Sequence, residues 1–436
     1  QRGLAMQVSV ESTGALERKM TVAVPEERVE SEIQNRLKRI AKTAKIDGFR
    51  PGKIPMSVVK QQYGASVRAD VVGEVIQSTY YEALGQEKLQ PAGMPNIEPK
   101  DIDGANGLEY VATFDVMPEV TPAPFSGVKL ESVKAEVMDA DIDKMLETLQ
   151  SQRASWDSVK RKSKDGERLT IDFEGKIDGE AFNGNSGQSV PVTLGGGRMI
   201  AGFEEGLVGA KAGDELTLDL TFPEDYAYEE VAGKPVQFAV TVHKVEKPKL
   251  PKLDDEFAKS LGIDDGSIDT LRAEVKGNME LELEQRIRAT LKEQVLNKIV
   301  EANEFEIPAA LIDNESQALL QQMQQQMQAS PGKSVDLNPE MFADEAKRRV
   351  QLGMVIAEII KQNELKADGD KVRAKIDSIA ATYEKPEDVV NYYYGDDKRL
   401  KEVESLVLEE SVIDWAIEQA DVEEVEKSYN DIMMQG

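Results

Sequence analysis

The stretch EERVESEIQNRLKRIAKTAKIDGFRPGKIP, residues 26–55, has a helical half and a turn-forming half, and this division decides how the N-terminal region folds. Apolar residues recur every three or four positions in the first half, at Val29, Ile33, Leu37, Ile40 and Ala44. Such spacing places them on one face of a helix. In the second half, Gly48 and Gly52 permit unusual backbone angles, while Pro51 and Pro55 fix φ and remove hydrogen-bond donors. The stretch therefore predicts a helix that ends in a surface loop.

Strand patterns lie on both sides of this helix and loop. Residues 6–24 and 110–116 alternate apolar and polar side chains, which is typical of half-buried strands. Residues 56–89 return to helical spacing and predict a pair of helices. The order of strands, helix, loop, helices and strands predicts a compact α+β domain over residues 1–117.

The rest of the chain divides into three further parts, and together they predict a multidomain α+β protein. The prolines of MPEVTPAPFSG predict a linker, which we place at residues 118–154. Residues 155–247 are rich in glycine and carry short β-type runs such as LTIDFEG and VQFAVTVHKVE, so they predict a small sheet domain. Residues 248–436 are helical in pattern, and residues 268–302 predict one helix of about 50 Å.

Composition excludes several classes of chemistry. The 436 residues contain no cysteine, which excludes disulfides, thiol catalysis and zinc–thiolate sites. They contain a single histidine, His243. LGGGR, residues 194–198, lacks the GK[ST] ending of a phosphate loop, and we expect neither a metal nor a cofactor. The N-terminal QRGLAMQVSV lacks the apolar segment of a secretory signal, so we expect a cytoplasmic protein, with Met6 as its natural start.

Charge is distributed unevenly along the chain. The net charge is −28, which argues against general binding to nucleic acid. Residues 36–60, however, hold eight cations and one anion. A basic segment on an acidic protein predicts a local contact with an anionic partner. Within it, Phe49 is flanked by Arg50 and Lys53, and an exposed aromatic between cations is typical of a docking contact. The alternative is a turn in which Phe49 packs back onto Ile46 or Ile54.

GFRPGKIP, residues 48–55, resembles the ribosome-docking signature of the trigger factor family. Members of this family are ribosome-associated chaperones of bacteria. The resemblance extends along the chain through IDGFR, YGASVR, TIDFEG, GRMIAGFEEG, AALID and NELKAD. It implies contact with the large ribosomal subunit near the exit tunnel, with ribosomal RNA as the only nucleic acid touched. The implied ribosome-binding residues are Phe49, Arg50, Gly52 and Lys53. Pro51 stands where many relatives have a lysine, which removes one cation and stiffens the loop.

The middle region resembles the FKBP-type prolyl isomerases, from Asp172 through GRMIAGFEEGL and DYAY to the last strand. The resemblance implies a proline pocket lined by Phe173, Phe182, Met199, Ile200, Phe203, Tyr228 and Phe238. Phe203 stands where many small relatives have a tryptophan, and Asn183 replaces the usual aspartate. Taken singly, each aromatic residue is better explained by core packing, and only their joint match indicates a site.

For the helical region, the resemblance implies a chaperone surface that cradles nascent and unfolded polypeptides without ATP, and a weak homodimer off the ribosome. Methionines such as Met323, Met327 and Met341 suit irregular apolar partners, although methionines also fill core gaps, as we expect for Met354. We expect Trp415 to be core. Two other functions stay open: a dedicated prolyl isomerase, and an adaptor that binds nucleic acid or a membrane surface through residues 36–60.

Overall fold

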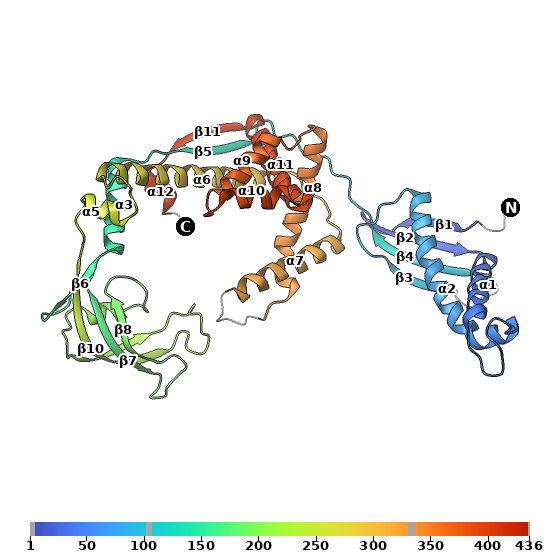
Figure 1. Ribbon diagram of the computed structural model, residues 1–436, viewed down its shortest axis with the longest axis horizontal. Coiled ribbons are helices and arrows are strands. Elements are labelled where there is room, and N and C mark those ends of the chain that lie inside the picture. Colours follow the sequence, from blue (N-terminus) through green and yellow to red (C-terminus); the bar gives the residue numbers. More distant parts are fainter. Residues whose placement is uncertain (1–4, 102–106, 330–335, 435–436) are drawn as a thin grey trace. The chain divides into compact units, whose positions relative to one another are not determined.

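The computed structural model divides into two compact units, each built from two separate stretches of the chain. Figure 1 shows its helices and strands, coloured from the N-terminus to the C-terminus. It describes residues 5–101, 107–329 and 336–434. One unit joins residues 1–131 with 290–423, and the other joins residues 132–289 with 424–436. Of the extension expected before Met6, residues 1–4 lie outside the described residues.

The N-terminal domain is a four-stranded antiparallel sheet with two helices. Its elements are β1 (Gln7–Ser12), β2 (Glu17–Val24), α1 (Glu26–Thr43), α2 (Met56–Glu87), β3 (Asn96–Asp101) and β4 (Leu108–Asp115), and the strand order is β1-β2-β4-β3. The predicted stripe holds, since Val29, Ile33 and Leu37 of α1 are buried in the domain core. The helical spacing over residues 56–89 belongs to the single helix α2 and not to two helices.

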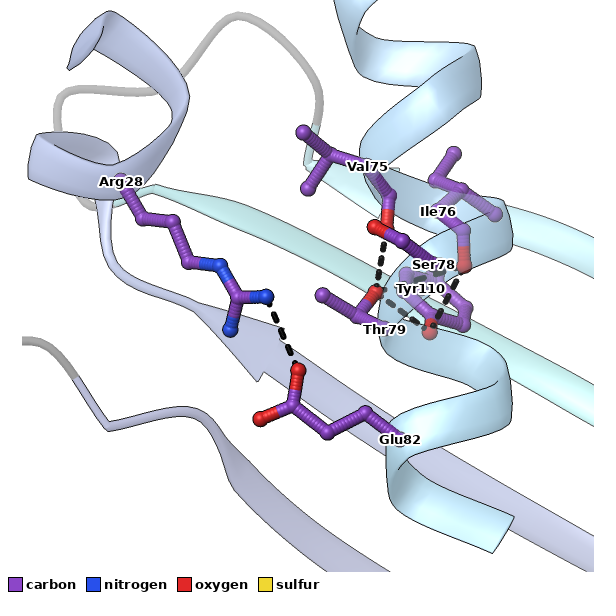
Figure 2. A network of polar contacts seen from close by, with 7 residues as sticks. All are labelled: Arg28, Val75, Ile76, Ser78, Thr79, Glu82 and Tyr110. Atoms are coloured by element: carbon purple, nitrogen blue, oxygen red, sulfur yellow. Dashed lines mark hydrogen bonds and ion pairs between the residues drawn. The ribbon is translucent and has the colours of Figure 1, made fainter. Parts of the chain in front are cut away.

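A small polar network fastens α2 to the sheet (Figure 2). The hydroxyls of Thr79 on α2 and Tyr110 on β4 lie 2.9 Å apart and are hydrogen-bonded, and Tyr110 also donates to the carbonyl of Ile76 at 3.3 Å. Burial raises the pKa of Tyr110. Arg28 on α1 pairs with Glu82 on α2 at 2.8 Å. Because buried hydroxyls are costly unless bonded, the network favours one register of α2 on β4.

The middle domain is a five-stranded sheet with one short helix. Its elements are β6 (Ser155–Val159), β7 (Arg168–Lys176), β8 (Ser186–Thr193), α4 (Phe203–Leu207), β9 (Glu215–Thr221) and β10 (Pro235–Lys249). Strand β10 is 15 residues long and therefore pairs with β9 through its first half, with β6 through its second half, and with β7 through most of its length. Strand β8 pairs with β7, and α4 closes the core, with Phe203 and Leu207 fully buried.

Residues 118–154 differ from the predicted linker, because they contain β5 (Lys129–Lys134) and α3 (Asp139–Gln152). Strand β5 pairs with β11 (Asp421–Glu426), near the end of the chain. Ile142 and Leu146 of α3 are buried in a cluster with Phe257 and Leu271. The prolines of the preceding segment are a local signal, whereas the partners that order β5 and α3 come from far along the sequence.

The remaining elements are helical, as the sequence predicts. They are α5 (Asp255–Ser260), α6 (Ile268–Ala302), α7 (Ala309–Gln328), the 3₁₀ turn η1 (Pro339–Phe342), α8 (Ala343–Gln362), α9 (Gly369–Ala380), α10 (Pro386–Tyr394), α11 (Asp397–Gln419) and α12 (Tyr429–Met433). The bounds of α6 are those expected. Met341 is 61% exposed and Met323 is 39% exposed, whereas Trp415 packs against the core at Phe125. Within the described ranges, no helix is both long and apolar enough to cross a bilayer.

Candidate functional site

A cavity of about 540 Å³ opens in the middle domain between the sheet, α4 and the segment after β9. The structure brings together at this cavity all seven residues that the resemblance implies, namely Phe173, Phe182, Met199, Ile200, Phe203, Tyr228 and Phe238. They come from β7, the β7–β8 connection, the loop before α4, α4 itself, the β9–β10 connection and β10. A shared cavity is a stronger signal than core packing of any one ring.

Three phenylalanines form the floor by edge-to-face packing. The ring centroid of Phe203 lies 6.1 Å from Phe173 and 5.3 Å from Phe238, and Phe173 and Phe238 are 6.0 Å apart. Such arrangements set the positive ring edge against the negative ring face. Strand register makes room for them, because Phe238 lies opposite Gly175, where a Cβ would come within 2.6 Å of the Phe238 ring. The glycine in TIDFEG is therefore required by the floor.

A second row of rings forms the wall and rim. Phe182 packs edge-on against Phe222 at 5.7 Å, Phe222 lies 4.8 Å from Tyr226, and Tyr226 lies 6.1 Å from Tyr228. Tyr228 is 62% exposed and so stands at the rim. Phe222 and Tyr226 are not among the residues that the resemblance implies. Both carried a signal, because Phe222 ends the alternating run DELTLDLTF and Tyr226 is the first tyrosine of DYAY.

Two polar side chains belong to the cavity lining. They are those of Asn183 and Arg198, and both are exposed. His243 lies outside the lining and is half exposed. Its Nε2 is 2.7 Å from Oδ2 of Asp172. The backbone N–H of Ser189 donates to Asp172 and, together with His243, lowers the pKa of that carboxyl.

The loop between α1 and α2 presents Phe49 at the surface, 40% exposed. Two tight turns shape it, since Phe49 N–H donates to Ile46 at 3.1 Å and Lys53 N–H donates to Arg50 at 3.0 Å. The glycines 48 and 52 have φ of 89° and 81°, which disfavour any other residue. Ile46 and Ile54 pack on the domain core, whereas Phe49 is not part of it. Among the residues that the structure describes, neither Arg50 nor Lys53 forms an ion pair.

Comparison with known proteins identifies the family. The chain is 50% identical over 426 residues to the trigger factor of Pseudomonas paraeruginosa, and the match covers 98% of each protein. This chain belongs to the trigger factor family. The trigger factor of Pseudoalteromonas atlantica is 46% identical, over 98% of this chain and 99% of that protein. The family profile described as bacterial trigger factor protein matches residues 6–149, and the profile of its C-terminus matches residues 267–418.

The middle of this trigger factor matches the profile of FKBP-type peptidyl-prolyl cis-trans isomerases over residues 159–243. A solved structure titled "Promiscuous Substrate Recognition in Folding and Assembly Activities of the Trigger Factor Chaperone" shares the fold, with a TM-score of 0.50 and 18% identity, over 94% of this chain and 99% of that one. The expected fold class is confirmed. The chain is a ribosome-associated chaperone that binds nascent chains, and it carries a peptidyl-prolyl cis-trans isomerase domain.

Proposed function

We propose that the aromatic cavity of the middle domain is the site of prolyl isomerisation. The observation that supports this most strongly is the convergence of the seven implied residues, with Phe222 and Tyr226, on one cavity. The floor and wall are aromatic rings, and the lining side chains Asn183 and Arg198 are exposed. A proline side chain would enter against Phe173, Phe203 and Phe238, with Met199 and Ile200 beside it.

The chemistry suits such a cavity. Rotation about a prolyl amide must break amide resonance, against a barrier of about 18–20 kcal/mol. The twisted amide is less dipolar than the planar amide, so an apolar cavity that excludes water stabilises the twisted form more than the planar one. Only such differential binding accelerates the step. The reaction asks for no nucleophile and no proton transfer, and the rings alone supply the selective environment.

Replacing Phe182 by alanine tests this site. Phe182 is only partly buried, so its loss removes one wall while the floor stays in place. We expect kcat/KM on an Xaa-Pro peptide to fall at least tenfold, which corresponds to about 1.4 kcal/mol. The matched control is Trp156→Ala, which removes a larger ring that lies outside the cavity and stacks under Arg168 at 4.5 Å. Wild-type turnover in Phe182→Ala would mean that the site lies elsewhere.

The α1–α2 loop is the proposed contact with the ribosome, through Phe49, Arg50, Gly52 and Lys53. An exposed ring beside two cations that form no ion pair within the described part of the chain supports this assignment. Phe49 would enter an apolar crevice of ribosomal protein, while the cations pair with carboxylates or with phosphates of ribosomal RNA. Gly52 holds the turn that presents Lys53.

The domains divide the work as follows in this proposal. Residues 1–117 dock on the ribosome, residues 155–247 isomerise prolyl bonds, and residues 248–436 bind clients. Strand β5 and helix α3 belong structurally with the helical part, because their buried residues pack there. Exposed apolar side chains such as Met323 and Met341 suit weak contacts with unfolded chains. The protein works in the cytoplasm and forms a weak homodimer when it is off the ribosome.

A further inference from the structure

Glu204 is a buried acid of the middle domain. It is 7% exposed, lies in α4 directly after Phe203, and uses both carboxylate oxygens. Oε2 accepts the backbone N–H of Gly197 at 2.9 Å, and Oε1 accepts the backbone N–H of Arg198 at 3.3 Å. The acceptor is therefore aimed at the segment that leads into the cavity-lining residues Met199 and Ile200.

Two other buried acids of the same domain are held differently. Glu167 pairs with Arg161 at 2.6 Å, and Glu246 pairs with Arg168 at 2.6 Å. Among the described residues, Glu204 is found in no ion pair, and its bonds go to backbone N–H groups. A buried carboxylate without a counter-ion is costly unless its hydrogen bonds compensate. The hydrogen bonds to Glu204 thus come from the loop backbone alone, whereas the other two acids also pair with cationic side chains.

The loop needs such a tether because it is made of consecutive glycines. Within LGGGR, Gly195 and Gly197 have φ of 83° and 69°, and glycine leaves the backbone free to adopt many other conformations. A hydrogen bond to a charged acceptor is stronger than one between neutral groups. Two such bonds at the end of the glycine run fix the backbone just before Met199. LGGGR is not a phosphate loop, and its glycines instead allow the backbone conformation that Glu204 holds.

We propose that Glu204 is a positioning residue for prolyl isomerisation. Its carboxylate holds the glycine loop 195–198 so that Met199 and Ile200 lie against the bound prolyl group. The inference rests on the proposed placement of the isomerase site in this cavity. Glu204 itself does not touch the reacting amide and acts only through the loop.

The test uses the full chain and two substitutions of Glu204. Glu204→Gln keeps the volume but replaces one acceptor oxygen by an NH₂ group that faces a backbone N–H. Glu204→Asp keeps the charge and both acceptors but is one methylene shorter. We expect kcat/KM on an Xaa-Pro peptide to fall at least fivefold in the Gln variant and less in the Asp variant. Amide hydrogen exchange in peptides covering residues 195–201 should accelerate at least tenfold in the Gln variant.

Glu246→Gln is the matched control, since it makes the same change at a buried acid outside the cavity. We expect this variant to melt at a lower temperature than wild type while its turnover stays within twofold. The inference is overturned if Glu204→Gln keeps wild-type turnover or wild-type exchange, if the Asp variant is no better than the Gln variant, or if Glu246→Gln loses turnover equally. Phe182→Ala, assayed in parallel, separates the two proposals. If it retains full activity, the cavity is not the site. If it loses activity while Glu204→Gln does not, only the positioning role fails.

Discussion

Replacing Phe49, Arg50 and Lys53 together by alanine should weaken ribosome binding at least a hundredfold. A ring desolvated at the centre of an interface contributes about 2 kcal/mol or more, and each exposed ion pair contributes about 0.2–1 kcal/mol. Their sum reaches the roughly 2.7 kcal/mol that a hundredfold change requires. Phe49→Ala alone should account for most of the loss. Co-sedimentation with purified ribosomes over a range of salt concentrations measures this, and salt should weaken wild-type binding more steeply because the variant has fewer charges to screen.

The same loop supplies the control. Ile54 is 6% exposed and lies in the domain core, whereas Phe49 is 40% exposed and lies outside it. Ile54→Ala should therefore cost about 2–5 kcal/mol of stability, while the triple variant should melt like wild type. A triple variant that melts many degrees lower would show that Phe49 is a packing residue. A triple variant that melts normally and still co-sediments like wild type would refute the docking assignment.

Two further outcomes follow from packing and charge. A chain ended after Leu250 should keep its isomerase activity, because the buried core of the middle sheet precedes that residue. It should, however, aggregate and lose chaperone capacity, because β5 and α3 in residues 118–154 lose their packing partners. Full suppression of aggregation by that shortened chain would place the client surface upstream. The pKa of Glu246 is lowered by its bond to Lys244 and, against the opposing effect of burial, by Arg168. Its stabilisation is therefore present above the ordinary carboxyl pKa of 4.5 and is lost as pH falls through the lower folded value, so the melting temperatures of wild type and Glu246→Gln should converge in acid. A constant difference down to pH 3 would contradict this, and thermal melts at several pH values decide it.

Local patterns were sufficient for the parts of the fold that local physics determines. The stripe of Val29, Ile33 and Leu37 predicted α1, and the uninterrupted spacing of residues 268–302 predicted α6, because side-chain periodicity and helix geometry are directly linked. The phenylalanines of the cavity floor were found through the family resemblance. From the local pattern alone, each of them is better explained as a core residue.

The misassigned parts depend on distant partners. Prolines and a glycine before residue 128 indicate an irregular segment, but nothing nearby in the sequence shows that β5 will meet β11. The cavity wall also holds rings beyond those that the resemblance implies. Of the two tyrosines in DYAY, the resemblance implies Tyr228, whereas both line the cavity and Tyr226 lies 4.8 Å from Phe222. A turn places Tyr226 there, in which its backbone N–H donates to the carbonyl of Pro223.

The pairing of β5 with β11 also determines which parts of the protein can fold while it is still being synthesised. Asp421 N–H donates to the carbonyl of Val128, and Lys427 N–H donates to that of Lys134, so β5 is completed by residues made almost 300 codons later. At about 5–20 residues per second, this delay is on the order of 15–60 s. The N-terminal sheet uses only β1–β4 and the middle sheet only β6–β10, so each can form during translation as soon as its own stretch of chain has emerged. The helical part cannot complete its folding until the last segment has emerged from the ribosome. A chaperone of nascent chains therefore has an incompletely folded helical part during most of its own translation.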